Sequence, residues 1–496
     1  MKRRYLIILV GALFLLNSCS DWLDVNPRSE IRENVLLSSE DGYKNALIGA
    51  YILLAQQGLY GRDASMYIPE ALSRHWTVSS NSSASFAQQL YRLSEFSYTN
   101  SNVEPLISGL WLNYYKVIVQ LNDILENLET SPVVFSQNNG RIIEGEALGL
   151  RAFLHLEILR LFGPVPDIAT QGELAIPYVT KMTKDPNKLV SISYSKVLEG
   201  IEKDLDAAEK LLEIDPVIRN SNDFLNNPIR SGGNLPEDKW QFYRQSRFNY
   251  YAVLGAKARF YHWIGNKAKA VDYAKKVVEA VNSDHSPKFA LATEATYSTS
   301  DFYSNLVMYS EHLFGIQNPD LQSIISPLFK ESSATLTQTE ALLNTAYETG
   351  VNVNDIRRPS RYWETVVYQT SVRTNHFRKY SGSNQIPTNN RVPVLRLAEL
   401  YLILIEDLPL EEAKPYFSAF RVSRALDISI EDPSTANETA LLSRLEREYR
   451  KEFYGEGQMF FFYKKHNYTR YTWPAAFTLP AGAYVIPKPK EQLSFE

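Results

Sequence analysis

The sequence predicts a mostly α-helical protein in which a helical scaffold faces a large loop-rich half. Apolar residues recur at helical spacing in eight segments, the pattern of amphipathic helices. Three long stretches lack that pattern: 60–102, 215–238 and 282–393. Long excursions from a scaffold are commonly functional when they are ordered, so we expect the ligand-facing side there. No low-complexity linker divides the chain, so we expect one body over residues 19–496.

The helical scaffold is expected mainly in residues 39–57, 103–281 and 395–455. One segment is expected to end at Gly163-Pro164, because glycine commonly caps a helix and a following proline stops it. The predicted helices are Ser39–Gln57, Val103–Glu129, Arg141–Phe162, Ser193–Glu213, Arg247–Ile264, Ala268–Val281, Leu395–Leu408 and Asn437–Gly455.

One pair of these segments resembles a tetratricopeptide unit. Arg247–Ile264 and Ala268–Val281 are separated by a turn at Gly265-Asn266, and their many alanines would let two helices pack closely. Tetratricopeptide units are helix–turn–helix pairs with a period of about 34 residues. The other helix pairs share no obvious sequence repeat, so the repeat interpretation depends on this single unit.

Composition excludes several classes of function. The 496 residues include 52 basic and 56 acidic side chains, a formal net charge of −4. A nucleic-acid-binding protein would be expected to show a basic surplus, and this chain has none. The single cysteine excludes intramolecular disulfides, redox pairs and zinc-cysteine sites.

The N-terminus predicts an export signal. Three basic residues, Lys2-Arg3-Arg4, precede the uncharged run Tyr5–Leu16. A membrane-spanning helix needs about 20 apolar residues, whereas a signal-peptide core has roughly 7–15. Because Tyr5–Leu16 is too short to span, residues 1–18 are interpreted as a signal peptide.

The lone cysteine follows that signal directly. Leu16-Asn17-Ser18-Cys19 resembles the lipobox of bacterial lipoproteins, which implies cleavage before Cys19 and acylation of this residue. The alternative is a plain secretory signal with an incidental cysteine. Several acyl chains would anchor the protein stably, with residues 19–31 as a lipidated tether. Removing Lys2, Arg3 and Arg4 leaves 49 basic against 56 acidic residues, so the mature chain carries −7.

Five segments of the chain carry a recognisable set of motifs. They are Ser20–Pro27 (SDWLDVNP), Glu144–Ile168 (EGEALGLRAFLHLEILRLFGPVPDI), Pro393–Glu406 (PVLRLAELYLILIE), Glu446–Lys465 (EREYRKEFYGEGQMFFFYKK) and Tyr484–Gln492. In this order they resemble the SusD/RagB family of Bacteroidetes outer-membrane lipoproteins, and Glu144–Ile168 is similar to the family's RAF…LVRLFG-x-VP segment. The chain departs from the family pattern at Met459–Tyr463 and at Ile405-Glu406-Asp407, which indicates a divergent subgroup.

The resemblance implies a SusD-like architecture, a tetratricopeptide-like scaffold with a loop-rich, ligand-facing half. It implies an outer-membrane lipoprotein on the extracellular face, acting with a SusC-like TonB-dependent transporter. Its ligand would be a nutrient, usually an oligosaccharide. No catalysis, cofactor, metal or nucleic-acid partner is implied.

The residues themselves give little support to catalysis. The chain contains no HExxH, G-x-S-x-G or phosphate-loop motif. Glu144 and Glu146 are candidates for a glycosidase carboxylate pair by proximity alone, and the favoured alternative places them on a solvated helix face. His155 is interpreted as a hydrogen-bonded scaffold residue, and Asp167 as part of a turn.

Binding is better supported, because sugar rings stack on flat aromatic surfaces that lie near polar groups. Trp76, Tyr362 and Trp363 are the candidate ligand-binding residues, since they lie in predicted loops among polar neighbours. A core role is an equal alternative for Trp76 and Trp363. The aromatics at helical spacing are expected in the core, and the run Phe460–Phe462 is expected in the core or at a partner contact.

Four functions stay open from the sequence. The first is oligosaccharide capture at the cell surface, and the second is the same role with a peptide or another nutrient. The third is a lipid-anchored glycan-degrading enzyme, and the fourth is a helical scaffold that binds only protein.

Overall fold

The structure is a computed structural model. It describes residues 36–78, 85–183, 185–221, 225, 235–297, 305–330, 336–350, 354–358, 362–368, 372–381, 390–426, 437–494 and 496. The predicted signal peptide, Cys19 and the tether therefore lie outside the described residues. In the part of the chain that is described, no helix is both long and apolar enough to span a membrane.

The fold is mostly helical, as the sequence predicts. The longer helices are α3 (Glu40–Ala55), α5 (Ser85–Ser94), α6 (Glu104–Thr130), α7 (Asn139–Phe162), α8 (Tyr194–Leu211), α11 (Tyr250–Trp263), α12 (Lys267–Val278), α16 (Leu397–Asp407), α17 (Leu410–Ser423), α18 (Glu438–Glu452) and α19 (Gln458–Lys465). The shorter ones are α4 (Ile68–Leu72), α9 (Pro216–Arg219), α13 (Glu294–Tyr297), α14 (Leu321–Ile325), α15 (Glu340–Ala346) and α20 (Lys490–Leu493).

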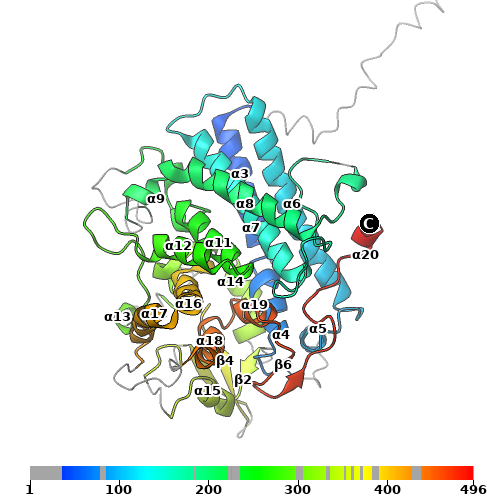
Figure 1. Cartoon of the computed structure of the whole chain (residues 1–496), viewed down its shortest axis with the longest axis vertical. Helices are drawn as coiled ribbons and strands as arrows, with labels where there is room; N and C mark the ends of the chain where they lie inside the picture. Colours follow the sequence, from blue (N-terminus) through cyan, green and yellow to red (C-terminus); the bar gives the residue numbers. More distant parts are fainter. Residues whose placement is uncertain are drawn as a thin grey trace, which may run out of the picture.

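Helix α7 is central among the long helices, and helices that follow one another in the sequence mostly pack against one another. Helices α3, α6, α7 and α8 lie side by side in one half of the molecule, and α11, α12 and α16 continue the helical layer (Figure 1). Every residue of α7 from Gly149 to Phe162 is buried, because neighbouring elements cover all faces of the helix there. A helix that is buried all round has to pair its polar side chains internally.

Helices α11 and α12 form the predicted tetratricopeptide-like hairpin. The side chain of Asn249 caps α11 by accepting from the backbone N–H of Ala252 at 3.0 Å. Asn266 caps α12 through Lys269 in the same way. Gly265 has a φ of +75°, which disfavours a side chain, so the tight turn between the helices requires glycine.

Within the residues that the structure describes, short strands form three small antiparallel sheets, which the sequence did not reveal. Strand β1 (His312–Gln317) pairs with β5 (Arg391–Arg396), and the second sheet has the order β2-β4-β3. The remaining strands are β2 (Thr337–Gln338), β3 (Trp363–Tyr368), β4 (Val372–Phe377), β6 (Arg470–Tyr471) and β7 (Phe477–Thr478). Strands β1 and β5 are buried on both faces, so their sequences lack the alternation that marks a half-exposed strand.

The stretches predicted as irregular are more regular than expected. Residues 60–102 contain α4 and α5, and residues 282–393 contain β1 to β4 together with α14 and α15. Helices α17 and α19 were not predicted either. Pro415 interrupts the pattern of α17, and the aromatic run of α19 has no helical period.

A buried ionic network joins the two halves. Arg396 on β5 contacts Glu311 and Glu452, and Arg424 after α17 contacts the same two carboxylates. Glu311 is bonded by two guanidinium groups and Glu452 by three, so each buried carboxylate is neutralised by more than one partner. The network fixes β5 against α18.

Candidate functional site

Trp76, a predicted sugar platform, lies in the core. It is 4% exposed, and its indole nitrogen donates to the carboxylate of Glu70 at 2.5 Å. The same carboxylate contacts His75 and accepts from the backbone N–H groups of Gly455 and Gly457. Glu70 therefore joins α4 to the segment before α19, and Trp76 is one of its anchors.

Tyr362 and Trp363 are buried as well, at 3% and 1% exposure. The ring of Trp363 lies 4.9 Å from Phe377, 5.0 Å from Tyr454 and 5.7 Å from Trp76. The phenol of Tyr362 donates to the carbonyl of Leu306 at 3.0 Å. We call Trp76, Trp363, Phe377 and Tyr454 the aromatic cluster.

The structure thus brings Trp76 and Trp363 together, but in the core role that the sequence left open. A ligand-stacking role needs an uncovered ring face, and the aromatic cluster covers both indoles. Contact of Trp76 and Trp363 with a ligand remains a prediction. The burial of both side chains does not favour it. The sequence could not decide, because a Trp among polar neighbours in a predicted loop can point inward or outward.

Glu144 and Glu146 do not share a solvated helix face. Glu146 is fully buried and pairs with Arg244 at 2.5 Å and Arg247 at 3.0 Å. Burial raises the pKa of the half-buried Glu144. The solvated-face interpretation was wrong for Glu146, because α7 is central in the fold and its buried carboxylate has to be neutralised by arginines.

His155 has the predicted scaffold role. Its two ring nitrogens lie 2.8 Å from the carbonyl of Arg151 and 3.0 Å from the backbone N–H of Val179. Burial lowers its pKa to about 3, so the ring is neutral at pH 7. Phe460, Phe461 and Phe462 are core residues, as expected.

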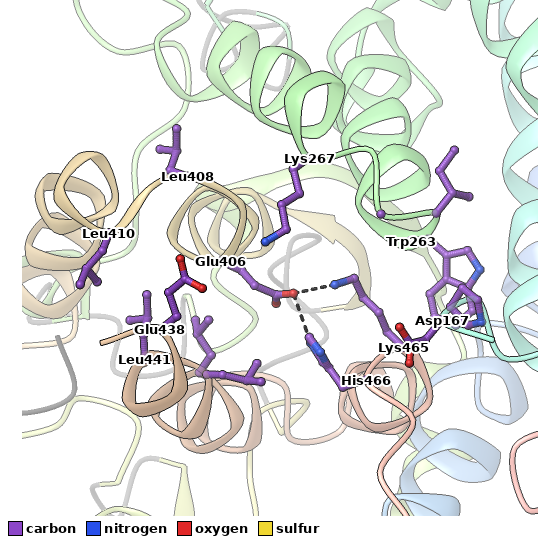
Figure 2. Close-up of a pocket in the computed structure, with 15 residues that line it drawn as sticks. Asp167, Trp263, Lys267, Glu406, Leu408, Leu410, Glu438, Leu441, Lys465 and His466 are labelled. Carbon is purple, nitrogen blue, oxygen red and sulfur yellow. Dashed lines mark hydrogen bonds and ion pairs between the residues drawn. The ribbon is translucent and has the colours of Figure 1, made fainter. Parts of the chain in front are cut away.

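A cavity of about 540 Å³ opens between the α11–α12 turn, the end of α16, the start of α18 and the end of α19 (Figure 2). Asp167, interpreted from the sequence as a turn residue, lies on its wall. One side of the cavity is apolar and comprises Leu408, Leu410, Leu441, Leu442 and Leu445. The other side carries Asp167, Lys267, Glu406, Glu438, Lys465 and His466. We call this space the charged cavity.

Glu406 is the centre of the polar side. Its carboxylate lies 2.6 Å from Lys465 and 3.2 Å from His466, and the amine of Lys267 points toward it (Figure 2). Burial raises the pKa of Glu406, but the charges of His262, Lys465 and His466 outweigh burial and hold that pKa well below its usual range. A carboxylate that stays ionised cannot serve as the general acid of glycoside hydrolysis.

His262, Glu406 and Asp407 bring possible metal ligands within 4.8 Å of one another. The two nitrogens of His262 face different carboxylates, with Nδ1 2.6 Å from Asp407 and Nε2 3.6 Å from Glu406. One imidazole cannot direct both nitrogens at a single ion, and the ammonium group of Lys465 already neutralises Glu406. These residues fit an ion-paired network better than a metal site.

The charged cavity offers donors, acceptors and an apolar wall within one open hollow. Such a combination can hold a polar organic molecule of moderate size through hydrogen bonds and apolar contact. The sequence marked none of its residues as ligand contacts, and Asp167 and Glu406 were singled out for other reasons. The polar residues come from distant segments of the chain, so no local sequence pattern links them.

A second hollow of about 630 Å³ lies beside α3. Its lining is largely uncharged and includes Ile48, Ile52, Gln56, Gln57, Ile316, Gln317 and Asn318. We call it the amide hollow. It is the second candidate for a ligand site, since amides also hydrogen-bond to hydroxyl groups.

Known proteins match the chain in sequence. A SusD-like family model, described as "Starch-binding associating with outer membrane", matches residues 21–220. SusD-like protein P25 of Formosa agariphila is 26% identical over 169 residues, which cover 34% of this chain and 31% of that protein. SusD-like protein P38 of the same organism is 29% identical over 210 residues, covering 42% and 37%. The matches thus span about a third of the length of these relatives.

Solved structures match over more of the chain. A SusD superfamily protein from Bacteroides thetaiotaomicron has a TM-score of 0.69 at 20% identity, covering 92% of this chain and 98% of that one. A SusD-like carbohydrate binding protein from Bacteroides vulgatus gives 0.65 at 18% identity, covering 92% and 96%. Surface glycan-binding protein A from Bacteroides thetaiotaomicron gives 0.64 at 15% identity, covering 92% and 97%. These structures show that the chain has the fold of SusD superfamily proteins, and the SusD-like family model and relatives match it over part of its length.

Proposed function

We propose that the protein is a cell-surface lipoprotein that captures an oligosaccharide and delivers it to a SusC-like TonB-dependent transporter in the outer membrane. The observation that carries the proposal is the SusD-like fold, which extends over 92% of the chain. Proteins with this fold include ones described as carbohydrate binding and glycan binding. The family model is described as associating with the outer membrane.

Several features of the described residues support binding over catalysis. Glu146 is neutralised by two arginines, and Glu406 by Lys465. His155 is neutral and uses both nitrogens in hydrogen bonds within the scaffold. Each of these groups is occupied in holding the fold, so none is poised to transfer a proton to a substrate.

A binding screen tests the ligand. The full-length chain in detergent is titrated with neutral and acidic oligosaccharides and with short peptides, by isothermal calorimetry. Saturable binding of an oligosaccharide without release of reducing sugar is the expected result. Binding of peptides alone would favour the alternative nutrient, and sugar release would favour an enzyme.

The lipid anchor has its own test. Labelled palmitate is expected to enter the wild-type chain in cells and not the Cys19→Ala variant. Equal labelling of both would reject the anchor. A pull-down on the wild-type chain, with the co-purified barrel identified by mass spectrometry, tests the transporter partner.

The charged cavity is the first place to look for the ligand. Lys267 and Glu438 line it and are exposed, so replacing both with alanine should leave the fold intact. We expect weaker oligosaccharide binding in that double variant and unchanged binding in Lys276→Ala, an exposed residue on the same helix α12 outside the cavity. Unchanged oligosaccharide binding in both variants would argue against the charged cavity as the ligand site. Ile52 and Gln56 in the amide hollow would then be substituted next.

A further inference from the structure

Three exposed charged side chains that line the charged cavity have no ion-pair partner among the residues that the structure describes. Lys267 begins α12, Glu438 begins α18, and Asp167 lies in the loop after α7. Glu406 and Lys465, in contrast, lie 2.6 Å apart and neutralise each other. The charges that remain for a ligand are therefore one amine and two carboxylates.

Lys267 and Glu438 do not neutralise each other either. The two side chains extend into the cavity from different helices (Figure 2), and the amine of Lys267 is more than 4.0 Å from the carboxylate of Glu438. Both residues are exposed, so a ligand can reach their charged groups. One ligand can therefore contact the amine and the carboxylate together.

The surroundings of these groups favour ionic contact with a ligand. Lys267 lies at the N-terminal end of α12, where the aligned peptide dipoles of the helix attract an anion. Leu408, Leu410 and Leu441 belong to the apolar side of the cavity. Apolar groups lower the local dielectric constant, so ion pairs beside them are stronger than ion pairs in bulk water. The same apolar side can contact the C–H groups of a sugar ring.

The ligand that complements this cavity carries charges of both signs. The cavity volume of about 540 Å³ is in the range of small-molecule sites, about 300–1,000 Å³. A carboxylate accepts hydrogen bonds from an amine, and an ammonium group donates to a carboxylate. We propose that the charged cavity binds a zwitterionic oligosaccharide, in which Lys267 binds a carboxylate of the sugar and Glu438 and Asp167 bind its ammonium groups. This inference rests on the proposed function and names the chemical class of its ligand.

The test compares four tetrasaccharides, titrated by calorimetry into the full-length chain in detergent at about pH 6, where amines are protonated and carboxyl groups are ionised. One alternates glucuronic acid with glucosamine and carries both charges. Its N-acetylated form carries only carboxylates, a glucosamine tetramer carries only ammonium groups, and an N-acetylglucosamine tetramer carries neither. We expect the first to bind about tenfold more tightly than the last, because each of two ion pairs between exposed groups contributes about threefold.

Two sets of variants assign the charges. Lys267→Gln should remove the preference for carboxylates and keep the preference for ammonium groups, and the Glu438→Gln/Asp167→Asn double variant should do the reverse. Lys276→Gln on α12 and Glu411→Gln on α17 are the matched controls, since both residues are exposed and lie outside the cavity. All the replaced side chains are exposed, so every variant should melt close to the temperature of wild type.

Three results would overturn the proposal. Equal or weaker binding of the doubly charged tetrasaccharide would show that the protein does not recognise the two charges. A preference that persists in both Lys267→Gln and the double variant would show that the charged ligand binds elsewhere. Tighter binding of a dipeptide with free termini would overturn the saccharide assignment. If no oligosaccharide binds wild type, neither these four nor those of the binding screen, the proposed function itself fails.

Discussion

The aromatic cluster and the charged cavity differ in how they satisfy their polar groups. In the cluster, the indole of Trp76 and two backbone N–H groups converge on Glu70, and aromatic rings exclude water. In the cavity, Glu406 is paired on one side and lies beside open space on the other. The first arrangement stabilises the fold and leaves nothing for a ligand. The second retains polar groups that a ligand can reach.

The largest effect is expected from Trp363→Ala. The variant removes a ring in contact with Trp76, Phe377 and Tyr454, and should lower the free energy of unfolding by about 3–5 kcal/mol in urea titrations. Trp363→Phe should cost much less, because it refills most of the space. A well-folded Trp363→Ala protein that has lost only ligand binding would show that the cluster is a binding site after all.

A smaller loss is expected from Glu70→Gln. The amide group replaces an oxygen that accepts hydrogen bonds with a nitrogen that cannot, so a buried N–H loses its partner. The free energy of unfolding should fall by about 1–3 kcal/mol. The matched control is Glu95→Gln, a part-exposed carboxylate paired with Arg74, which should change little. Equal effects in both variants would argue against the Glu70 junction.

Glu406→Gln should lower stability at pH 7 by about 1–2 kcal/mol, because Lys465 and His466 lose their carboxylate. The pKa of Glu406 is lowered in the folded state, so its contribution is present above the unfolded pKa of about 4.3. That contribution is lost as the pH falls below this value, since the unfolded state takes up the proton first. Wild type and variant should therefore converge in acid urea titrations. A gap that persists at low pH would contradict this assignment, and Glu411→Gln at an exposed pair is the control.

The smallest change in stability is expected from Lys267→Ala. This exposed side chain should contribute less than about 0.5 kcal/mol to the fold. Its removal should still weaken ligand binding, because its amine faces the charged cavity (Figure 2). Scanning calorimetry on Lys267→Ala and Lys276→Ala measures stability, and titration calorimetry on the same two variants measures ligand binding. Loss of stability without loss of ligand binding would show that Lys267 supports the fold and does not contact the ligand.

The sequence predicted the scaffold well. The observed bounds of α6, Glu104–Thr130, differ from the predicted Val103–Glu129 by one residue at each end, because a long amphipathic pattern marks a helix clearly. Strands β1 and β5 could not be predicted, since burial on both faces removes their alternation.

The candidate sites were harder to predict than the scaffold. Trp363 looked like a loop aromatic, and only the three-dimensional contacts show it inside the core. Glu406 on α16 and Lys465 on α19 reach the charged cavity from separate helices, so spacing along the chain carries no signal for their pairing.

The junction at Glu70 also affects how the chain can fold as it is made. Glu70 accepts from Gly455 and Gly457, which lie 385 and 387 positions later, and Tyr98 donates to the carbonyl of Ala483 across 385 positions. The ribosome synthesises the N-terminus first. The carboxylate of Glu70 therefore has no backbone N–H donors from Gly455 and Gly457 until those residues have been synthesised. Contacts of such long sequence separation slow folding. A fragment ending at residue 220 would therefore lack the partners of its own core and should not fold as an independent unit.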